Sequence, residues 1–202
     1  MRAVSLVLLV LGLAGCGGGD TPPAEVDAGG IMLTDSGSGS ACEIPAEPYG
    51  TSVGRTIEPF TLDQCDGTPY SFYGDDFCDT RLTVISIAAG WCAPCMAESA
   101  ELTERVTERY RADGVRVIQV IVQNPDRTAP TPEFCQQWVD NFGLTNIEVI
   151  DPSGVTSPFF TTDALPETIF VDSRGVIVFR EAGASAGLVS LTSKIEELLA
   201  EM

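Results

Sequence analysis

The chain has 202 residues and a formal net charge of −18, with 29 acidic residues against 11 basic ones and no histidine. Such an acid-rich chain is not expected to bind nucleic acid through phosphate contacts or anionic lipid head groups through charge. The absence of histidine removes the base of a Ser-His-Asp triad and a common ligand of metal sites. No glycine-rich phosphate loop is present either, so we expect no cofactor, no metal and no nucleic-acid partner.

The first 15 residues are typical of a secretory signal peptide. Arg2 precedes an apolar run over residues 3–13, which is shorter than the roughly 20 residues that span a bilayer. Residues 13–16 read Leu-Ala-Gly-Cys, which resembles the lipobox of bacterial lipoproteins. The resemblance implies that Cys16 is acylated after cleavage at 1–15; the alternative is an ordinary signal peptide with a chance cysteine. The residue after Cys16 is Gly17 and not aspartate. By the sorting pattern of lipoproteins in well-studied Gram-negative bacteria, this favours the outer membrane.

Residues 16–41 are expected to form a lipid-anchored flexible linker. Glycine, proline and serine alternate there with acidic residues, and no apolar period survives that could offset the entropy of ordering. Loss of the signal peptide removes Arg2 and leaves 10 basic and 29 acidic residues, a charge of −19. The remaining residues, 42–202, have the length of one domain with a core of its own.

Strands and helices alternate along this domain. An Asp66-Gly67 turn separates two short strand-like runs and predicts a hairpin. Later, Gly114 and Gly143 each stop a helical pattern. A mixed sheet flanked by helices is therefore predicted. The expected strands are 59–62, 69–72, 82–89, 115–122, 147–150, 168–171 and 176–179, and the expected helices are 93–112, 131–142 and 188–202.

Residues 91–95 read Trp-Cys-Ala-Pro-Cys and follow the apolar run directly. A strand that delivers this spacing of two cysteines to a helix start is typical of thiol–disulfide exchange. The amides of a helix N-terminus favour the thiolate of Cys92, and Cys95 lies one turn on, within reach for a disulfide. The alternatives are half of a zinc site, which would need two more ligands, and a purely structural disulfide.

Three features resemble the TlpA/ResA/CcmG group of membrane-tethered thiol–disulfide oxidoreductases in the thioredoxin superfamily. They are the stretch 91–95, Glu98 three residues after the second cysteine, and Leu-Pro-Glu-Thr at 165–168. The resemblance covers roughly residues 49–200. It implies a thioredoxin-like α/β fold with an added N-terminal β-hairpin. It also implies that Cys92 attacks, that Cys95 resolves and that Pro166 follows a cis peptide bond.

Three further positions carry expectations from the same resemblance. Glu98 would modulate the thiols, because a desolvated carboxylate can move a thiol proton; the alternative is a solvated helix glutamate. Trp91 would shield the disulfide; the alternative is that this bulky aromatic side chain only packs against its neighbours. Pro166 could also be an ordinary trans proline at the start of a strand. Ser86, six residues before Cys92, departs from thioredoxins proper, which have a buried acid there.

Four other cysteines in the domain suggest two structural disulfides. Cys65 and Cys78 flank the first hairpin region and are the favoured pair, which leaves Cys42 to bridge to Cys135. Three pairings are open, and free buried thiols are the alternative.

These features predict a thiol–disulfide oxidoreductase of the bacterial cell envelope, lipid-anchored through Cys16 and facing the periplasm. We expect a monomer that reduces the disulfides of partner proteins and is reset by a membrane thiol donor, although the sequence leaves the redox direction open. One alternative is a peroxiredoxin-type thiol peroxidase, which would need a lone peroxidatic cysteine. The other is a redox-inert thioredoxin-like binding module in which Cys92 and Cys95 form only a staple.

Overall fold

The computed structural model describes residues 44–159 and 164–202. The expected signal peptide, linker, lipidation site Cys16 and Cys42 lie outside these residues and stay predictions. In the part of the chain that is described, no helix is long and apolar enough to cross a membrane.

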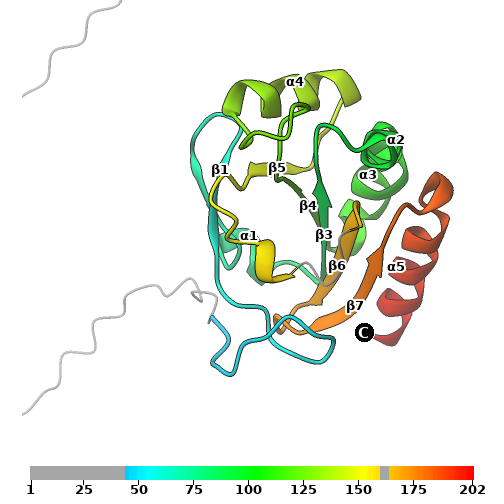
Figure 1. Ribbon diagram of the computed structural model, residues 1–202. Helices are drawn as coiled ribbons and strands as arrows, with labels where there is room; N and C mark the ends of the chain where they lie inside the picture. The colour runs from blue at the N-terminus through cyan, green and yellow to red at the C-terminus, as the bar shows by residue number, and fades with distance from the viewer. Residues whose placement is uncertain (1–43, 160–163) are drawn as a thin grey trace, which may run out of the picture. The chain divides into compact units, whose positions relative to one another are not determined.

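A seven-stranded mixed sheet forms the centre of the domain, in the order β2-β1-β5-β4-β3-β6-β7 (Figure 1). β3 pairs with β4, and β4 with β5, in parallel, while every other neighbouring pair of the sheet is antiparallel. The strands are β1 Thr61–Gln64, β2 Pro69–Ser71, β3 Leu82–Ala88, β4 Val115–Ile121, β5 Ile147–Ile150, β6 Glu167–Asp172 and β7 Ile177–Ala182. The predicted mixed sheet and its N-terminal hairpin are confirmed.

The two parallel pairs need crossover helices, because a short turn cannot reverse the chain between parallel strands. The segment from α2 through a π turn at Thr103–Thr107 and α3 connects β3 to β4, and α4 connects β4 to β5. Gly114 and Gly143 end these two segments with φ values of 80° and 61°, which glycine adopts without strain. The helices are α1 Asp75–Cys78, α2 Ala93–Leu102, α3 Glu108–Tyr110, α4 Pro132–Phe142 and α5 Val189–Glu201.

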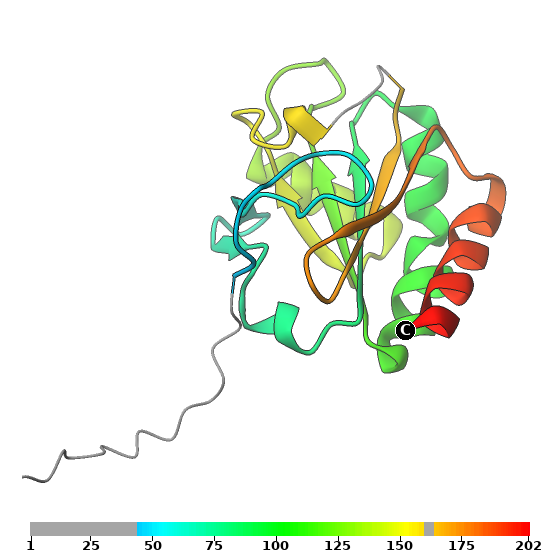
Figure 2. The same ribbon diagram turned by 90° about the horizontal axis from the view of Figure 1, so that it is seen from below.

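The three longer helices cover one face of the sheet. Leu102 of α2, Trp138 of α4 and Ile195 of α5 belong to one buried cluster, and Figure 2 shows α2 and α5 side by side. The opposite face is covered by the chain before β1, by α1 and by the 3-10 turn Ser157–Phe159. Its core is rich in aromatic side chains: Phe60, Phe72, Tyr73, Phe77 and Phe159. Helical elements therefore flank both faces, as expected.

α1 and a π turn were not expected from the sequence. α1 has four residues, too few to show a 3.6-residue apolar period. The π turn at Thr103–Thr107 widens the predicted helix 93–112 without ending it, so the apolar spacing of that stretch still reads as one helix.

The packing of α5 into this buried cluster can be tested by truncating Ile195, which is fully buried. We expect Ile195→Ala to lower the free energy of unfolding by about 2–5 kcal/mol, because a cavity replaces the side chain. Urea unfolding followed by circular dichroism measures the change. Val189→Ala, on the same helix but 60% exposed, is the matched control and should cost much less. Equal losses in both variants would contradict the proposed packing of α5.

Candidate functional site

A disulfide joins Cys92 to Cys95 at the junction of β3 and α2. Cys92 is the N-cap residue of α2, with φ −87° and ψ 98°, and its sulfur accepts a hydrogen bond of 3.1 Å from the backbone N–H of Cys95. Gly90 permits this junction, because a Cβ there would lie 2.5 Å from Cζ of Phe134 and 2.7 Å from the nitrogen of Pro125. The spacing of 91–95 therefore places one sulfur against the amides of a helix N-terminus.

This arrangement stabilises an anionic sulfur when the disulfide is reduced. The N–H groups of the first helical turn carry partial positive charge, and a hydrogen bond to an anion is stronger than one to a neutral atom. Cys92 is 3% exposed and Cys95 1% exposed. The site can thus hold a thiolate at Cys92 and a thiol at Cys95 one turn below.

Trp91 is fixed on two sides. Its indole N–H donates a hydrogen bond of 2.7 Å to Oε1 of Gln123, and the guanidinium of Arg127 lies 4.0 Å from the ring centroid. Arg127 adopts a φ of 66° in the loop after β4, a conformation that is uncommon outside glycine. This cation–π contact places a basic side chain against Trp91, the residue before Cys92, in a strongly acidic protein.

Glu98 is buried on α2, 6% exposed, and is not a solvated helix residue. Its Oε1 accepts a hydrogen bond of 2.6 Å from the backbone N–H of Ser185. Burial raises the pKa of Glu98 to about 7; the Ser185 bond opposes this shift and the negative charge of Glu181 adds to it. A cavity of about 90 Å³ is lined by both Glu98 and Pro94, the residue between Ala93 and Cys95.

A chain of hydrogen bonds leads away from Glu98 toward α5. Ser190 lies 2.6 Å from the hydroxyl of Ser185, and its own hydroxyl donates to the Glu181 carboxylate at 2.9 Å. Two carboxylates, Glu98 and Glu181, are thereby linked through Ser185 and Ser190. Because Ser185 is 87 residues from Glu98 in the chain, the sequence offers no signal for this link.

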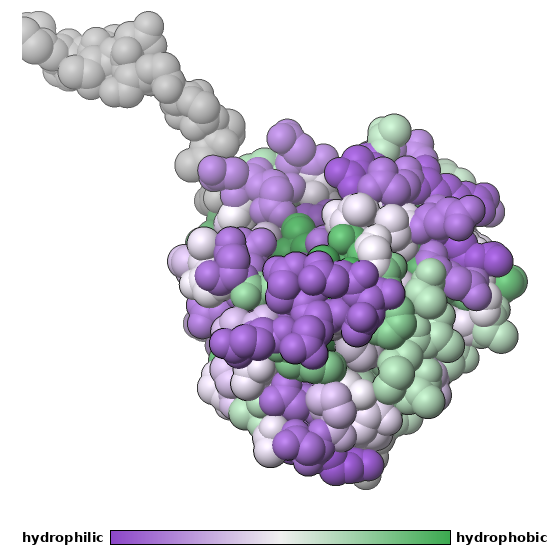
Figure 3. Space-filling model, turned by 90° about the horizontal axis from the view of Figure 1, so that it is seen from above, coloured by the Kyte–Doolittle hydropathy of each residue, from purple (hydrophilic) through white to green (hydrophobic). Residues whose placement is uncertain are grey.

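Pro166 lies at the same end of the sheet as the disulfide. The β3–β6 register ends with Ile87 opposite Glu167, so the next position sets Pro166 against Ala88. The Leu165–Pro166 peptide bond is cis, as the resemblance implies. Figure 3 looks onto this end of the molecule, where hydrophobic patches lie between hydrophilic ridges, so a partner would meet a mixed surface.

A neutral polar network occupies the space beneath α2. The side chain of Gln119 on β4 bonds to Ser99 of α2 at 3.0 Å, to Ser86 at 3.4 Å and to the indole N–H of Trp138 at 2.8 Å. Ser86 is thus a buried partner of an amide. Gln119 carries no motif in the sequence, and only the packing of α2 and α4 on β4 reveals it.

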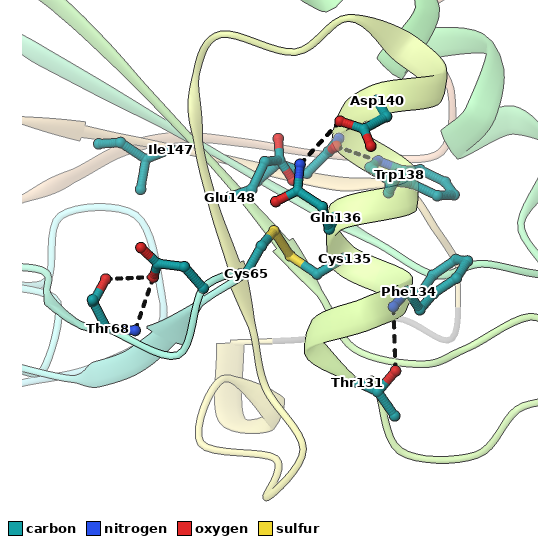
Figure 4. The surroundings of a disulfide bond; sticks show 12 residues. Cys65, Thr68, Thr131, Phe134, Cys135, Gln136, Trp138, Asp140, Ile147 and Glu148 are labelled. Carbon is teal, nitrogen blue, oxygen red and sulfur yellow. Dashed lines mark hydrogen bonds between the residues drawn. A yellow bond between two sulfur atoms is a disulfide. The ribbon is translucent and has the colours of Figure 1, made fainter.

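The favoured pairing of the remaining cysteines is wrong. Cys65 is bonded to Cys135, with their Cα atoms 5.1 Å apart (Figure 4), so neither Cys65–Cys78 nor Cys42–Cys135 forms. Cys78 is also disulfide-bonded. The physical reason is that β1 pairs with β5, which brings the end of β1 beside α4, the helix that precedes β5. Closeness in sequence favoured Cys78 as the partner of Cys65, but the pairing of β1 with β5 brings Cys65 beside Cys135 instead.

No metal site accompanies these cysteines: residues 44–159 and 164–202 contain no group of three or more His, Cys, Asp or Glu side chains that could hold a metal ion. The residues that the sequence did not single out are Gln123, Arg127, Gln119 and Ser185. The Asn-Pro-Asp turn at 124–126 was the one local signal of a shaped loop near Arg127.

Comparison with known proteins agrees with this geometry. The profile of the Redoxin family matches residues 52–199. The thiol:disulfide interchange protein DsbE of Vibrio cholerae is 25% identical over 155 residues, which cover 76% of this chain and 78% of DsbE. HelX of Rhodobacter capsulatus, also a thiol:disulfide interchange protein, is 28% identical over 135 residues, 66% of this chain and 70% of HelX.

Solved structures show the same fold. A crystal structure described as a DsbE from Chlorobium tepidum has a TM-score of 0.62 at 18% identity and covers 74% of this chain and 99% of that one. A secreted Mycobacterium tuberculosis disulfide oxidoreductase has a TM-score of 0.52 at 16% identity, with 71% and 96% covered. The matched profile, the sheet order and the disulfide at the start of α2 together show that this chain belongs to the Redoxin family and has the fold of the thioredoxin-superfamily thiol–disulfide oxidoreductases.

Proposed function

We propose that this protein is an extracytoplasmic, membrane-tethered thiol–disulfide oxidoreductase that reduces disulfides of partner proteins. The observation that carries the proposal is the position of the Cys92–Cys95 disulfide, whose first sulfur caps α2 and accepts the Cys95 N–H. A purely structural disulfide does not need a helix start that stabilises an anionic sulfur. The matched relatives, DsbE and HelX, are named as thiol:disulfide interchange proteins.

The chemistry follows from the two environments. In the reduced protein, the Cys92 thiolate attacks one sulfur of a partner disulfide, and the other partner sulfur leaves as a thiolate that takes a proton from water. The thiol of Cys95 then loses its proton and attacks the sulfur of Cys92. The second partner sulfur leaves, and the Cys92–Cys95 disulfide forms. Two electrons have passed to the partner, and a membrane thiol donor must return the protein to the dithiol.

Glu98 and Pro166 serve this reaction in the proposal. Glu98 lines the same cavity as Pro94 and changes protonation near neutral pH, so it can accept and return the proton of a nearby thiol. Pro166 adjoins the end of β3, where an extended partner segment can approach the sulfurs. Trp91, held by Gln123 and Arg127, forms a rigid border beside Cys92.

Replacing each cysteine separates their roles. We expect Cys92→Ser to abolish dithiol-driven reduction of insulin, because it removes the sulfur at the helix start. Cys95→Ser keeps that sulfur and should accumulate mixed disulfides with partner proteins, visible on non-reducing gels and by mass spectrometry. Full insulin reduction by Cys92→Ser would rule out the assigned site. Peroxide consumption without insulin reduction would instead identify a thiol peroxidase. The absence of both activities would indicate a binding module.

Glu98→Gln should change how stability depends on pH. The folded protein keeps the Glu98 proton up to about pH 7, whereas the unfolded chain releases it near 4.5, so the native protein loses stability as pH rises through this window. The variant has no such proton, and its loss between these values should be smaller by about 1–2 kcal/mol, after allowance for solvent screening. Urea unfolding across the window measures this, with exposed Glu104→Gln as the matched control.

The same variant tests the catalytic proposal. If Glu98 exchanges a proton with the thiols, the pH–rate profile of insulin reduction has an inflection near the Glu98 pKa of about 7, and Glu98→Gln removes it. Glu104→Gln should keep the inflection. A profile that is unchanged in Glu98→Gln would restrict Glu98 to a structural role.

The tether is tested at Cys16, which lies outside the described residues. We expect the mature protein to begin with an acylated Cys16 and to fractionate with membranes, because an acidic domain and a polar linker offer no other anchor. Mass spectrometry of the mature N-terminus decides this. Cys16→Ser should release the protein into the soluble fraction, and an unmodified Cys16 in membrane-bound protein would refute the lipid anchor.

A further inference from the structure

The Cys65–Cys135 disulfide has two unequal sulfurs. Cys65 follows the end of β1 and is half-buried, whereas Cys135 lies in α4 and is fully buried. Thiol–disulfide exchange depends on which sulfur an attacking thiol can reach. Cys65, the less buried of the two, is therefore the sulfur more open to attack, and Cys135 is the sulfur that must leave into the protein interior.

A leaving thiolate inside a protein needs a proton, and a buried carboxyl group lies opposite Cys65, the other half of the same bond. The β1–β5 register pairs Asp63 with Ile150 and Gln64 with Val149, so the next position sets Cys65 opposite Glu148. Residues opposite each other in an antiparallel ladder have Cβ atoms about 4.5–5.5 Å apart. Figure 4 shows the Glu148 side chain reaching into the space between β5 and α4 that holds the disulfide.

The environment of Glu148 is that of a neutral acid. The residue is 5% exposed; Oε1 accepts a hydrogen bond of 2.5 Å from Asn146, and the buried Oε2 has no hydrogen-bond partner among the described residues. Burial raises the pKa of Glu148 well above its ordinary value, and the Asn146 bond opposes this only in part. A buried carboxyl oxygen without a partner is costly, so a function at this position would explain its presence.

We propose that Cys65 and Cys135 form a second thiol–disulfide exchange centre, with a dithiol as its reductant and Glu148 as its proton donor. The reductant's thiolate attacks Cys65, the bond to Cys135 breaks, and the electron pair passes to Cys135, which takes the Glu148 proton. The second thiol of the reductant then loses its proton and displaces Cys65, which is protonated by water. The reductant leaves as a disulfide, and water returns a proton to Glu148.

This centre is independent of the function proposed above, and its test keeps the two apart. In the full-length chain carrying Cys92→Ser and Cys95→Ser, no electrons reach Cys65–Cys135 from the first centre, and the added dithiothreitol is the reductant. Differential alkylation followed by peptide mass spectrometry reports Cys65 and Cys135 separately under native conditions. Failure of insulin reduction at Cys92 would leave this measurement unaffected.

We expect the Cys65–Cys135 bond to be reduced in the folded protein, faster than the protein unfolds. Glu148→Gln keeps an acceptor for Asn146 but removes the proton, and should slow reduction at neutral pH by at least about tenfold, at the low end of general-acid effects. Asp140→Asn is the matched control: it removes an exposed acid from α4 that bonds Gln136, and should change the rate by less than about twofold.

The pH profile separates proton donation from a structural role. The β1–β5 register places Cys65 opposite Glu148, Cys135 is the other half of that disulfide, and α4 carries the charged residues Glu133 and Asp140, the second of which is labelled in Figure 4. After correction for the thiolate fraction of dithiothreitol, the rate should fall as Glu148 loses its proton, whereas Glu148→Gln should give a flat profile. The unsubstituted Glu148 chain shows this decline even if Glu148→Gln fails to fold.

Two results would overturn the proposal. If Cys65 and Cys135 become reducible only as fast as the protein unfolds, measured in parallel by circular dichroism, the bond is a structural staple. If the corrected rate with Glu148 in place does not change with pH, or if Glu148→Gln and Asp140→Asn react equally fast, Glu148 is not the proton donor.

Discussion

The buried strand β3 is the element on which the rest of the structure depends. All seven of its residues are buried, and it pairs with β4 on one side and β6 on the other. Because its partner β4 is parallel, the chain must leave β3 through a crossover helix, and α2 begins only a few residues after Ala88. The amides of that helix start meet Cys92, and the β6 pairing brings Pro166 to the same edge. The location of the thiol chemistry is thus a consequence of strand pairing.

α4 supports this edge from the side. Phe134 fills the space that only a glycine at position 90 leaves open, and Trp138 reaches Gln119 beneath α2. The Cys65–Cys135 bond ties the same helix to the end of β1. The two disulfides therefore share one buried cluster, although they join different elements. Any opening of the second bond would loosen a helix that contacts the surroundings of the first.

Local patterns predicted most of the fold because their causes are local. Thr131 caps α4 through the N–H of Phe134, and Gly143 ends it in a left-handed conformation. The cysteine spacing at 91–95 was sufficient to predict the junction, since a helix start and two thiols one turn apart lie within five residues. The disulfide pairing failed for the opposite reason. Cys65 and Cys78 are near in sequence, but Cys65 meets Cys135 through the long-range pairing of β1 with β5.

The sequence by itself determined the fold class, the order of the strands and the longer helices, and the two sulfurs at the head of α2, because hydrophobic period, caps and glycine stops act over a few residues. Only the tertiary structure decided the environment of each polar side chain. Glu98 and Glu148 are both buried glutamates, yet one receives an amide 87 residues away and the other retains an unpartnered oxygen. Desolvation depends on what packs against a group, and that is set by contacts between residues distant in the chain.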